Sequence, residues 1–306
     1  MKTAFLFTGQ GSQFAGMGKD LAEHHDVARE VFAEADAALG ESLSTLCFEG
    51  PDEQLGLTTN TQPATLAVST AAFRALGQTP ELAAGHSLGE YTALTAAGTF
   101  QFGDALRLVR QRAQFMQDAV PVGTGGMVVL RKMSVAEAEE FIAKIDAGVC
   151  EIANINAPGQ IVLSGETAAM DQAVEILGKR AMRLSVSVPF HSSMLRDAAV
   201  QYAEVLDGVE MQDPAFPIYC NVDAAPVTTA DAARDALRRQ FAGSVLWQTS
   251  IERMIQDAGV TRFVEFGPKP TLSRMAANIA RGIETEGIES VAVSTSAELD
   301  AVRADA

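Results

Sequence analysis

Basic residues are scarce in this 306-residue chain: 23 Lys and Arg stand against 39 Asp and Glu, which gives a formal net charge of −16. A broad nucleic-acid-binding surface needs the opposite sign, so we expect no nucleic-acid partner. Cysteine is also rare. Cys47, Cys150 and Cys220 lie far apart without zinc-site spacing, and one is necessarily unpaired. We therefore expect no metal site, and reduced thiols typical of the cytoplasm.

Long hydrophobic runs are missing as well. No stretch approaches the roughly 18 to 20 apolar residues of a membrane span, and the apolar N-terminal run breaks at Gly9, too early for a signal peptide. We therefore expect no membrane association. Hydrophobic residues nevertheless make up 47% of the chain and charged residues 20%, which excludes a disordered or disulfide-stapled protein.

Short apolar runs bounded by turn residues alternate with segments of helical period, a pattern typical of an α/β fold. Strands are expected at 3–8, 82–84, 216–220 and 262–266. Helices are expected at 62–76, 90–97, 103–119, 247–258 and 270–281. The tail beyond Glu298 carries no pattern that demands structure.

The middle of the chain has its own order of elements. Strands are expected at 127–130, 149–155, 160–163 and 182–188, and helices at 135–145 and 170–177. This β-α-β-β-α-β order is typical of a ferredoxin-like module. The sequence therefore predicts a small ferredoxin-like subdomain at 124–187, inserted into a large, discontinuous α/β subdomain made of 1–123 and 188–306.

Gly85-His86-Ser87-Leu88-Gly89 is a G-x-S-x-G motif between an expected strand and an expected helix. Strand, sharp turn and helix form the context of a nucleophile elbow, in which the serine projects from the bend and the helix N-terminus faces the reacting carbonyl. The motif predicts Ser87 as a nucleophile. The alternative is a glycine-rich turn with an ordinary serine.

A serine nucleophile needs a base, and the chain has four histidines. His24 and His25 lie in an acidic helical stretch and are expected to be solvated. His86 neighbours Ser87 along the chain, but adjacency does not aim its ring at the hydroxyl. His191 lies where the small module returns to the large one, so it is the candidate base, with a purely structural role as the alternative.

Arg112 lies within the apolar arc of the helix expected at 103–119. A buried guanidinium cannot lose its proton and requires a compensating group. Two interpretations stay open. In the first, Arg112 has a structural role, either in an internal ion pair, for example with Glu90, or with its charged end reaching solvent along the edge of the core. In the second, its guanidinium binds a substrate carboxylate through two parallel hydrogen bonds.

The loop Gly9-Gln10-Gly11 does not fit nucleotide binding. Phe14 stands where a dinucleotide fingerprint needs glycine, and no P-loop lysine follows. We expect this loop to bring a backbone N–H close to the site.

Taken together, these motifs resemble malonyl-CoA:acyl carrier protein transacylases. The resemblance rests on Gly9-Gln10-Gly11-Ser12-Gln13, Gly85 to Glu90, Arg112 with Met116-Gln117, Asn154 to Gln160, and Phe190-His191-Ser192. It implies an α/β-hydrolase-like core with a ferredoxin-like insert, and no cofactor or metal. It also implies malonyl transfer from malonyl-CoA to an acyl carrier protein, for fatty-acid synthesis.

The resemblance assigns roles to five residues. Ser87 would carry the malonyl group, His191 would be the general base and acid, and Arg112 would hold the malonyl carboxylate. The backbone N–H groups of Gln10 and Leu88 would form the oxyanion hole. A main-chain carbonyl, rather than an aspartate, would orient the His191 ring.

Three features depart from the family pattern. Thr8 replaces a common proline, and Leu246 stands where bacterial fatty-acid members often carry glutamine. If only the carbonyl at that position orients His191 the change is silent, and if the side chain matters the site differs. The charge of −16 disfavours acidic carrier proteins, so docking is expected at local basic clusters. These clusters are Lys179, Arg180 and Arg183, and Lys269, Arg274 and Arg281.

Other functions remain open at this point. The same chemistry serves polyketide synthases, polyunsaturated fatty-acid synthases and malonate decarboxylases. A thioester hydrolase would use the same serine and histidine, although Arg112 disfavours uncharged acyl chains. A catalytically idle carrier-binding module is disfavoured by the intact Ser87 and His191.

Overall fold

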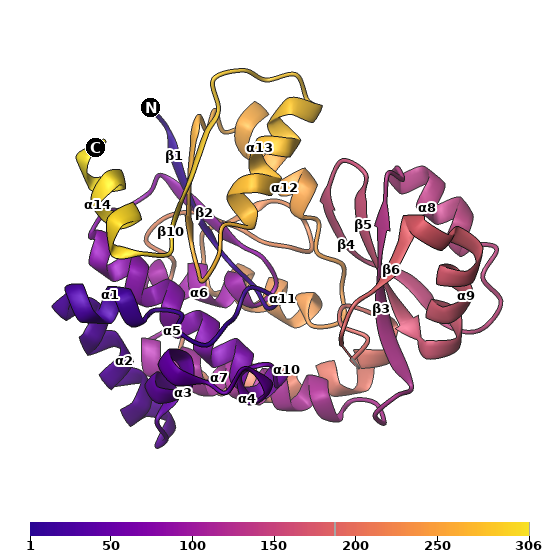
Figure 1. The fold of residues 1–306 in the computed structure, drawn as a ribbon, viewed down its shortest axis with the longest axis horizontal. Coiled ribbons are helices and arrows are strands. Elements are labelled where there is room, and N and C mark those ends of the chain that lie inside the picture. Colours follow the sequence, from indigo (N-terminus) through magenta and orange to yellow (C-terminus); the bar gives the residue numbers. More distant parts are fainter. Residues whose placement is uncertain (187, 306) are drawn as a thin grey trace.

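The computed structural model describes residues 1–186 and 188–305. Its strands form two separate sheets, one of six strands and one of four, and helices pack against both (Figure 1). The fold is an α/β-hydrolase-like core with a small ferredoxin-like subdomain, as the sequence predicts.

The large sheet has the order β10-β9-β1-β2-β7-β8. Its strands are β1 (Thr3–Phe7), β2 (Leu82–Gly85), β7 (Ile218–Tyr219), β8 (Pro226–Val227), β9 (Arg262–Phe266) and β10 (Glu289–Val293). All neighbours are parallel except β7 and β8. The carboxyl ends of β1 and β2 therefore meet at one edge, where ligand sites of such sheets form.

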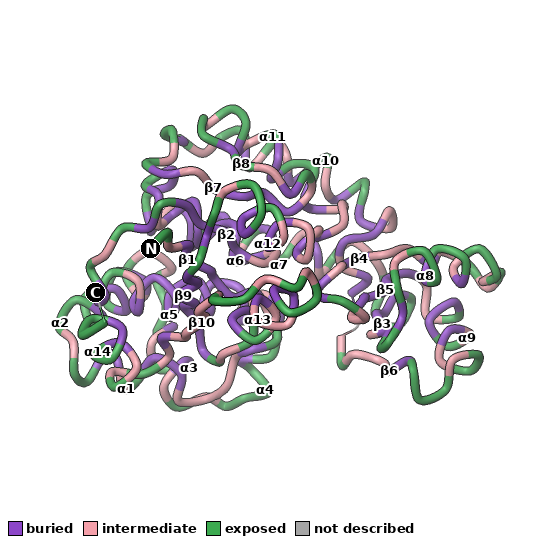
Figure 2. The backbone as a smooth tube through the Cα atoms, turned by 90° about the horizontal axis from the view of Figure 1, so that it is seen from above, coloured by how far each residue is buried: buried purple, intermediate pink, exposed green. Residues whose placement is uncertain are grey.

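The helices around this sheet are α1 (Lys19–His24), α2 (Asp26–Leu39), α3 (Leu43–Glu49), α4 (Asp52–Leu55), α5 (Thr58–Leu76), α6 (Leu88–Ala96), α7 (Phe102–Asp118), α10 (Arg196–Asp207), α11 (Ala230–Gln240), α12 (Trp247–Gln256), α13 (Leu272–Gly282) and α14 (Ser296–Ala304). A 3₁₀ turn at Ser193–Leu195 precedes α10. Figure 2 shows that buried residues concentrate in the strands and on the inner sides of these helices.

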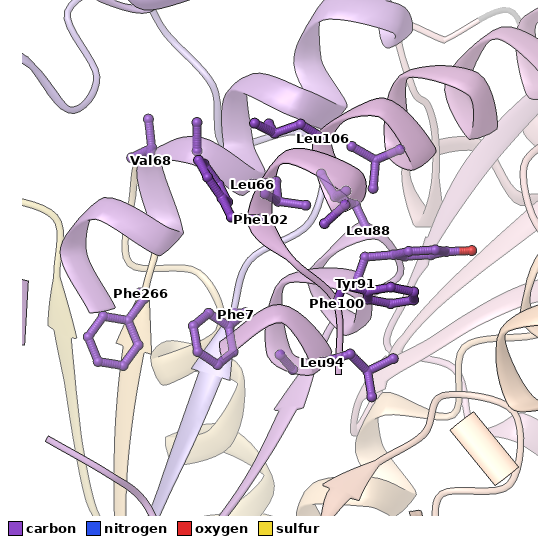
Figure 3. Packing of buried hydrophobic residues seen from close by; sticks show 14 of the residues in the cluster. Phe7, Leu66, Val68, Leu88, Tyr91, Leu94, Phe100, Phe102, Leu106 and Phe266 are labelled. Carbon is purple, nitrogen blue, oxygen red and sulfur yellow. The ribbon is translucent and has the colours of Figure 1, made fainter. Parts of the chain in front are cut away.

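Alternation along β1 distributes side chains between two cores. Phe5 and Phe7 pack into the larger core with residues of α2, α5, α6 and α7. Ala4 and Leu6 pack on the other face, with residues of α12 and α13. In the larger core the rings of Phe7 and Phe266 stack at 5.4 Å between centroids (Figure 3). The strand that leads into the Gly9 loop is thus held from both faces.

The small sheet has the order β4-β5-β3-β6 and is antiparallel. Its strands are β3 (Gly125–Arg131), β4 (Cys150–Ala157), β5 (Gln160–Glu166) and β6 (Ala181–Arg183), and its helices are α8 (Val135–Ile142), α9 (Thr167–Leu177) and a 3₁₀ turn at Gly178–Arg180. Both the chain order and the spatial order match a ferredoxin-like module.

The structure corrects some element boundaries. The sequence beyond Glu298 carries no pattern that demands structure, but α14 continues through it to Ala304 and is capped by Thr295 and Glu298 in a capping box. Strand β6 is shorter than the strand expected at 182–188, and Ser187 within that range lies outside the described residues. Helix α5 begins four residues before the expected 62–76.

Candidate active site

Ser87 occupies the bend between β2 and α6 with φ 51° and ψ −103°, a conformation that costs energy for a residue with a Cβ. The flanking glycines are sterically required. A Cβ on Gly85 would lie 1.8 Å from the carbonyl carbon of Gly89, and a Cβ on Gly89 would lie 2.0 Å from the backbone oxygen of Phe7. The motif therefore forms the sharp strand-to-helix turn expected of a nucleophile elbow.

Asn221, just after β7, holds this bend. Its Oδ1 accepts from the backbone N–H of Ser87 at 2.7 Å, and its Nδ2 donates to the backbone oxygen of Gly85 at 2.8 Å. One buried side chain thus satisfies a donor on the strained residue itself and an acceptor two residues before it.

His191 meets Ser87 across the site, with Nε2 2.7 Å from Oγ. Its Nδ1 lies 3.1 Å from the backbone oxygen of Gln240 and 3.0 Å from that of Gly243. Carbonyl oxygens only accept hydrogen bonds, so the proton is on Nδ1 and Nε2 is free to accept from the serine hydroxyl. This arrangement permits proton transfer from Ser87 to His191.

Burial, assisted by the charge of Arg112, lowers the pKa of His191 from 6.5 to about 3. The imidazole is therefore neutral near pH 7, the form that can act as a base. His191 also has a positive φ of 58°, so both partners of the pair hold strained backbone conformations.

The carbonyl of Leu246 does not orient His191. It accepts from the N–H and hydroxyl of Ser250 in the first turn of α12. The carbonyls beside His191 belong to Gln240 and Gly243, six and three residues earlier. The fold of the 241–246 loop, rather than a local motif, decides which carbonyl faces the ring.

Arg112 projects from α7 into the site and is 1% exposed. Nη1 donates to Oε1 of Gln62 at 2.8 Å, and Nη2 donates to Oε1 of Gln240 at 2.9 Å and to Oγ of Ser87 at 3.1 Å. The guanidinium also lies 5.1 Å from the ring centroid of Tyr91, a cation–π contact. These partners fix the side chain beside the reacting hydroxyl.

A direct ion pair between Arg112 and Glu90, an example within one of the two interpretations left open by the sequence, is not formed. No ion pair of Arg112 occurs within the described residues, and the amide of Gln240 bonds to both side chains. Neutral amide oxygens accept from Nη1 and Nη2 of Arg112, while its Nε has no partner within the described residues, and none of these contacts cancels the charge. The site therefore contains a buried cation suited to a two-pronged bond with a carboxylate.

A cavity of about 480 Å³ opens at these groups. Gln10 and Leu88 line it together with Ser87, His191 and Arg112, while Met127 of β3 and Asn154 of β4 contribute from the small sheet. Leu88 is the first residue of α6, so its N–H is one of the helix donors without an intrahelical acceptor. The side chain of Gln10 is anchored by a 3.2 Å bond to Thr58.

The other histidines point elsewhere. His86 is half-buried, and its Nε2 lies 2.8 Å from Oδ1 of Asn156, which connects the elbow to β4. His24 is exposed on α1, and His25 is half-buried and bonds to Ser296.

Sequence reasoning missed Gln62, Asn221 and Gln240. Gln240 shares a helix face with Ala233, Ala236 and Leu237, so it is a polar residue on an apolar stripe, the signal that identified Arg112. Gln62 belongs to a helix that is buried nearly all round, and Asn221 follows a strand directly. The last two signals are weak because many buried polar residues are purely structural.

Within the described residues, no group of three or more His, Cys, Asp or Glu is arranged to hold a metal ion. None of the helices in that part of the chain is long and apolar enough to cross a membrane.

Comparison with known proteins agrees with this geometry. The model of the acyl transferase domain family matches residues 4–299. Malonyl CoA-acyl carrier protein transacylase of Bacillus subtilis is 42% identical over 293 residues, which cover 93% of this chain and 92% of that protein.

Solved structures are similar as well. An acyl-carrier-protein S-malonyltransferase from Burkholderia pseudomallei superposes with a TM-score of 0.94 at 42% identity, covering 99% of this chain and 100% of that chain. A malonyl transacylase structure, of a complex with its type II PKS acyl carrier protein, superposes with a TM-score of 0.94 at 38% identity, with 100% of both chains covered.

Proposed function

Because the chain belongs to the acyl transferase domain family, we propose that it moves a malonyl group from malonyl-CoA to the phosphopantetheine thiol of an acyl carrier protein. One observation carries this proposal. The Ser87 hydroxyl lies between a neutral imidazole at 2.7 Å and a buried guanidinium at 3.1 Å. A nucleophile, a base and a carboxylate-binding cation therefore meet at one oxygen.

The reaction we propose has two steps. Ser87 Oγ attacks the thioester carbonyl while His191 Nε2 takes its proton, and the backbone N–H groups of Gln10 and Leu88 stabilise the oxyanion. The carbon–sulfur bond then breaks, and coenzyme A leaves with the proton returned by His191. In the second step the carrier thiol loses its proton to His191 and attacks the malonyl-serine ester, and Ser87 leaves as the reprotonated hydroxyl.

Arg112 selects the acyl group in this scheme. The malonyl carboxylate would bond to the guanidinium in place of its contact with Ser87, so that Oγ is released for attack. Burial strengthens such a charge-assisted bond because water does not compete for it. A hydrolase for uncharged acyl chains would gain nothing from this cation.

The site also bears on domain organisation. We propose that 124–187 is one subdomain inserted between 1–123 and 188–306, which together form the catalytic subdomain. Support comes from the small sheet, all of whose strands fall between Gly125 and Arg183. The cavity lies where the two subdomains meet, since Met127 and Asn154 line it opposite Ser87.

The basic residues after β9 support carrier docking better than those of the small subdomain. Lys269, Arg274 and Arg281 are exposed, and the Lys269 ammonium lies 4.8 Å from the ring centroid of Phe14, next to the cavity-lining Gln13. In the other cluster, Arg183 is already bonded to Asp171. Charge reversal at Lys269 and Arg274 should raise the KM for the carrier and leave acylation by malonyl-CoA intact.

Fatty-acid synthesis in the cytoplasm is the setting we propose. All three cysteines are free thiols, which supports a reducing compartment. A polyketide synthase is the second candidate, since a similar structure is a complex with a type II PKS carrier. Rates with carriers from the two kinds of pathway would distinguish them.

The test of the proposed function uses the purified protein with malonyl-CoA and a carrier bearing phosphopantetheine. We expect malonyl-carrier to form much faster than free malonate. Faster release of malonate than of malonyl-carrier would identify a hydrolase instead.

A further inference from the structure

Glu90 is a buried carboxyl that the mechanism above does not use. It lies in the first turn of α6, three residues after Ser87, and is 0% exposed. Its Oε2 accepts from the backbone N–H of Asn221 at 2.9 Å and from Nε2 of Gln240 at 3.0 Å. Its Oε1 has no hydrogen-bond partner within the described residues. A buried carboxyl is costly, so its bonds call for an explanation.

The second group in this chain of contacts is the Gln240 amide. Its Nε2 donates to the backbone oxygen of Ser87 at 2.8 Å and to Glu90, while its Oε1 accepts from Nη2 of Arg112. Both hydrogens therefore meet acceptors and the oxygen meets a donor. If the amide were reversed, its oxygen would face the oxygens of Ser87 and Glu90, and its NH₂ group would face the guanidinium of Arg112. These buried groups would then lack hydrogen-bond partners.

We propose that Glu90 is a positioning residue for malonyl selectivity: it holds the Gln240 amide so that its oxygen faces Arg112 and keeps the guanidinium beside Ser87. This inference rests on the proposed function, because it assumes that Arg112 binds the malonyl carboxylate. It adds a residue that touches neither substrate nor Ser87 Oγ and acts through Gln240.

The role requires an acceptor at Oε2 and does not require a charge. Burial raises the pKa of Glu90 to about 7. In the protonated form, with hydrogen on Oε1, the other oxygen still accepts both bonds. In Glu90→Gln the amide oxygen can take the place of Oε2, so this variant keeps the acceptor, whereas Glu90→Leu removes it at similar volume.

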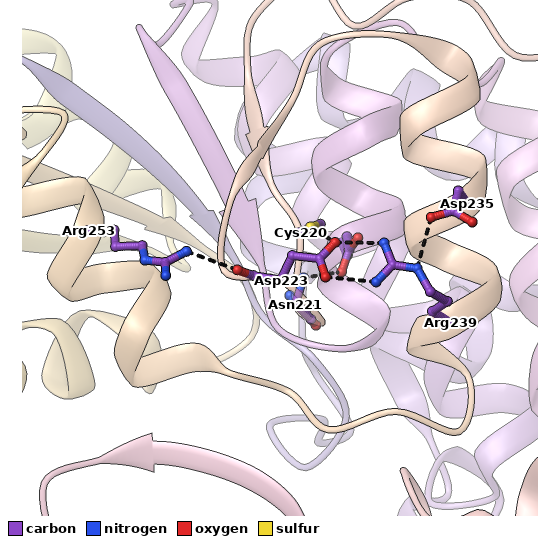
Figure 4. Close-up of polar contacts among 7 residues, drawn as sticks. Cys220, Asn221, Asp223, Asp235, Arg239 and Arg253 are labelled. Atoms are coloured by element: carbon purple, nitrogen blue, oxygen red, sulfur yellow. Dashed lines mark hydrogen bonds and ion pairs between the residues drawn. The ribbon is translucent and has the colours of Figure 1, made fainter.

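The end of α11, next to the Gln240 amide, is also held by contacts that do not involve Glu90. Arg239 forms a two-pronged bond with Asp223, at 2.7 and 2.6 Å, and Arg253 donates to the backbone oxygen of Asp223 at 3.0 Å (Figure 4). These contacts join the end of α11 to the segment that follows β7, so the Gln240 carbonyl can stay beside His191 when Glu90 is replaced. Glu90→Leu also leaves the backbone N–H of Asn221 without its acceptor, whereas Gln240→Leu does not, and the comparison of the two variants separates these effects.

The experiment compares kcat/KM for malonyl-CoA and acetyl-CoA, because acetyl lacks the carboxylate that Arg112 would bind. Glu90→Leu should lower the malonyl-to-acetyl ratio about five- to tenfold, the effect of one lost buried hydrogen bond, mainly through the malonyl KM. Glu90→Gln should retain the ratio within about twofold. Thr92→Val is the matched control, since Thr92 is also buried on α6 and its hydroxyl has no partner within the described residues.

If Glu90→Leu does not fold, Gln240→Leu carries the test and should show the same malonyl-selective loss while Glu90→Gln retains the ratio. If Glu90→Leu folds, adding it to Gln240→Leu should lower the ratio no further. Equal losses for both substrates, or a Glu90→Gln variant as impaired as Glu90→Leu, would overturn the role of Glu90. A wild-type protein that does not transfer malonyl would instead contradict the proposed function, so the two failures are distinguishable.

Discussion

Nη2 of Arg112 lies 3.1 Å from Oγ of Ser87, and the same oxygen lies 2.7 Å from Nε2 of His191. The guanidinium has two consequences at this point. Its charge adds to burial, the larger cause, in lowering the pKa of His191, and in the proposed function it also binds the substrate carboxylate. The proposed function therefore couples base strength and acyl selectivity through one buried side chain.

Arg112→Ala should impair malonyl transfer far more than acetyl transfer. Loss of one partner from a buried, hydrogen-bonded charge pair lowers kcat/KM about thirtyfold to several thousandfold. Acetyl transfer should stay unchanged or improve, because acetyl has no carboxylate that the lost guanidinium would bind. Steady-state kinetics with both thioesters, with thermal melts alongside, measure this difference.

Arg112→Lys is the matched control for that experiment. An ammonium keeps the charge but cannot form the two-pronged contact, so only part of the malonyl rate should return. If Arg112→Ala lowers both rates in proportion, together with the melting temperature, Arg112 is structural and the carboxylate site is refuted.

His191→Ala should lower malonyl transfer by about 10² to 10⁴, the usual range for a lost general base. His86→Ala should cost less, because the His86 ring bonds to Asn156 and not to the serine hydroxyl. Single-turnover acylation of the two variants gives the comparison. The reverse order of activities would identify His86 as the base.

The pH dependence of the acyl-transfer rate should reflect the lowered pKa of the buried His191. His191 must be neutral to accept the serine proton, and its pKa is lowered from 6.5 to about 3. The rate should therefore persist as pH falls through 6.5 and decline only as pH approaches 3. A short thioester without phosphate groups avoids titration of coenzyme A itself.

The Arg112→Ala variant tests the cause of this behaviour. Removing the positive charge removes one of the influences that lower the pKa of His191, so the acid limb of acetyl transfer should move to higher pH. An acid limb that is already near pH 6.5 in the wild type would show that the ring is less buried than in this structure.

Sequence patterns predicted the local features well. The G-x-S-x-G motif predicted the bend at Ser87 because the glycines that the bend requires all lie within five consecutive residues. The helical period predicted that Arg112 is buried because its position on the apolar face follows from the sequence of one helix. The capping box at Thr295 and Glu298 could have revealed α14 by the same kind of local reasoning.

Contacts between residues far apart in the sequence could not be predicted from such local patterns. Gln240 lies 153 positions from Ser87, and Asn221 lies 134 positions away. Which carbonyl meets His191 depends on how the end of α11 packs, so the sequence could not show that Gln240 and Gly243, and not Leu246, supply it. The choice between the interpretations of Arg112 stayed open for a similar reason, since only the tertiary fold places the Gln240 amide between Arg112 and Glu90.

The most direct test of the account is acylation of Ser87 itself. The purified protein is incubated briefly with malonyl-CoA, and intact-mass and peptide-mapping mass spectrometry then locate the label. We predict one malonyl group, attached at Ser87, and none in Ser87→Ala. Label on a cysteine or another serine, or label that persists in Ser87→Ala, would contradict the account.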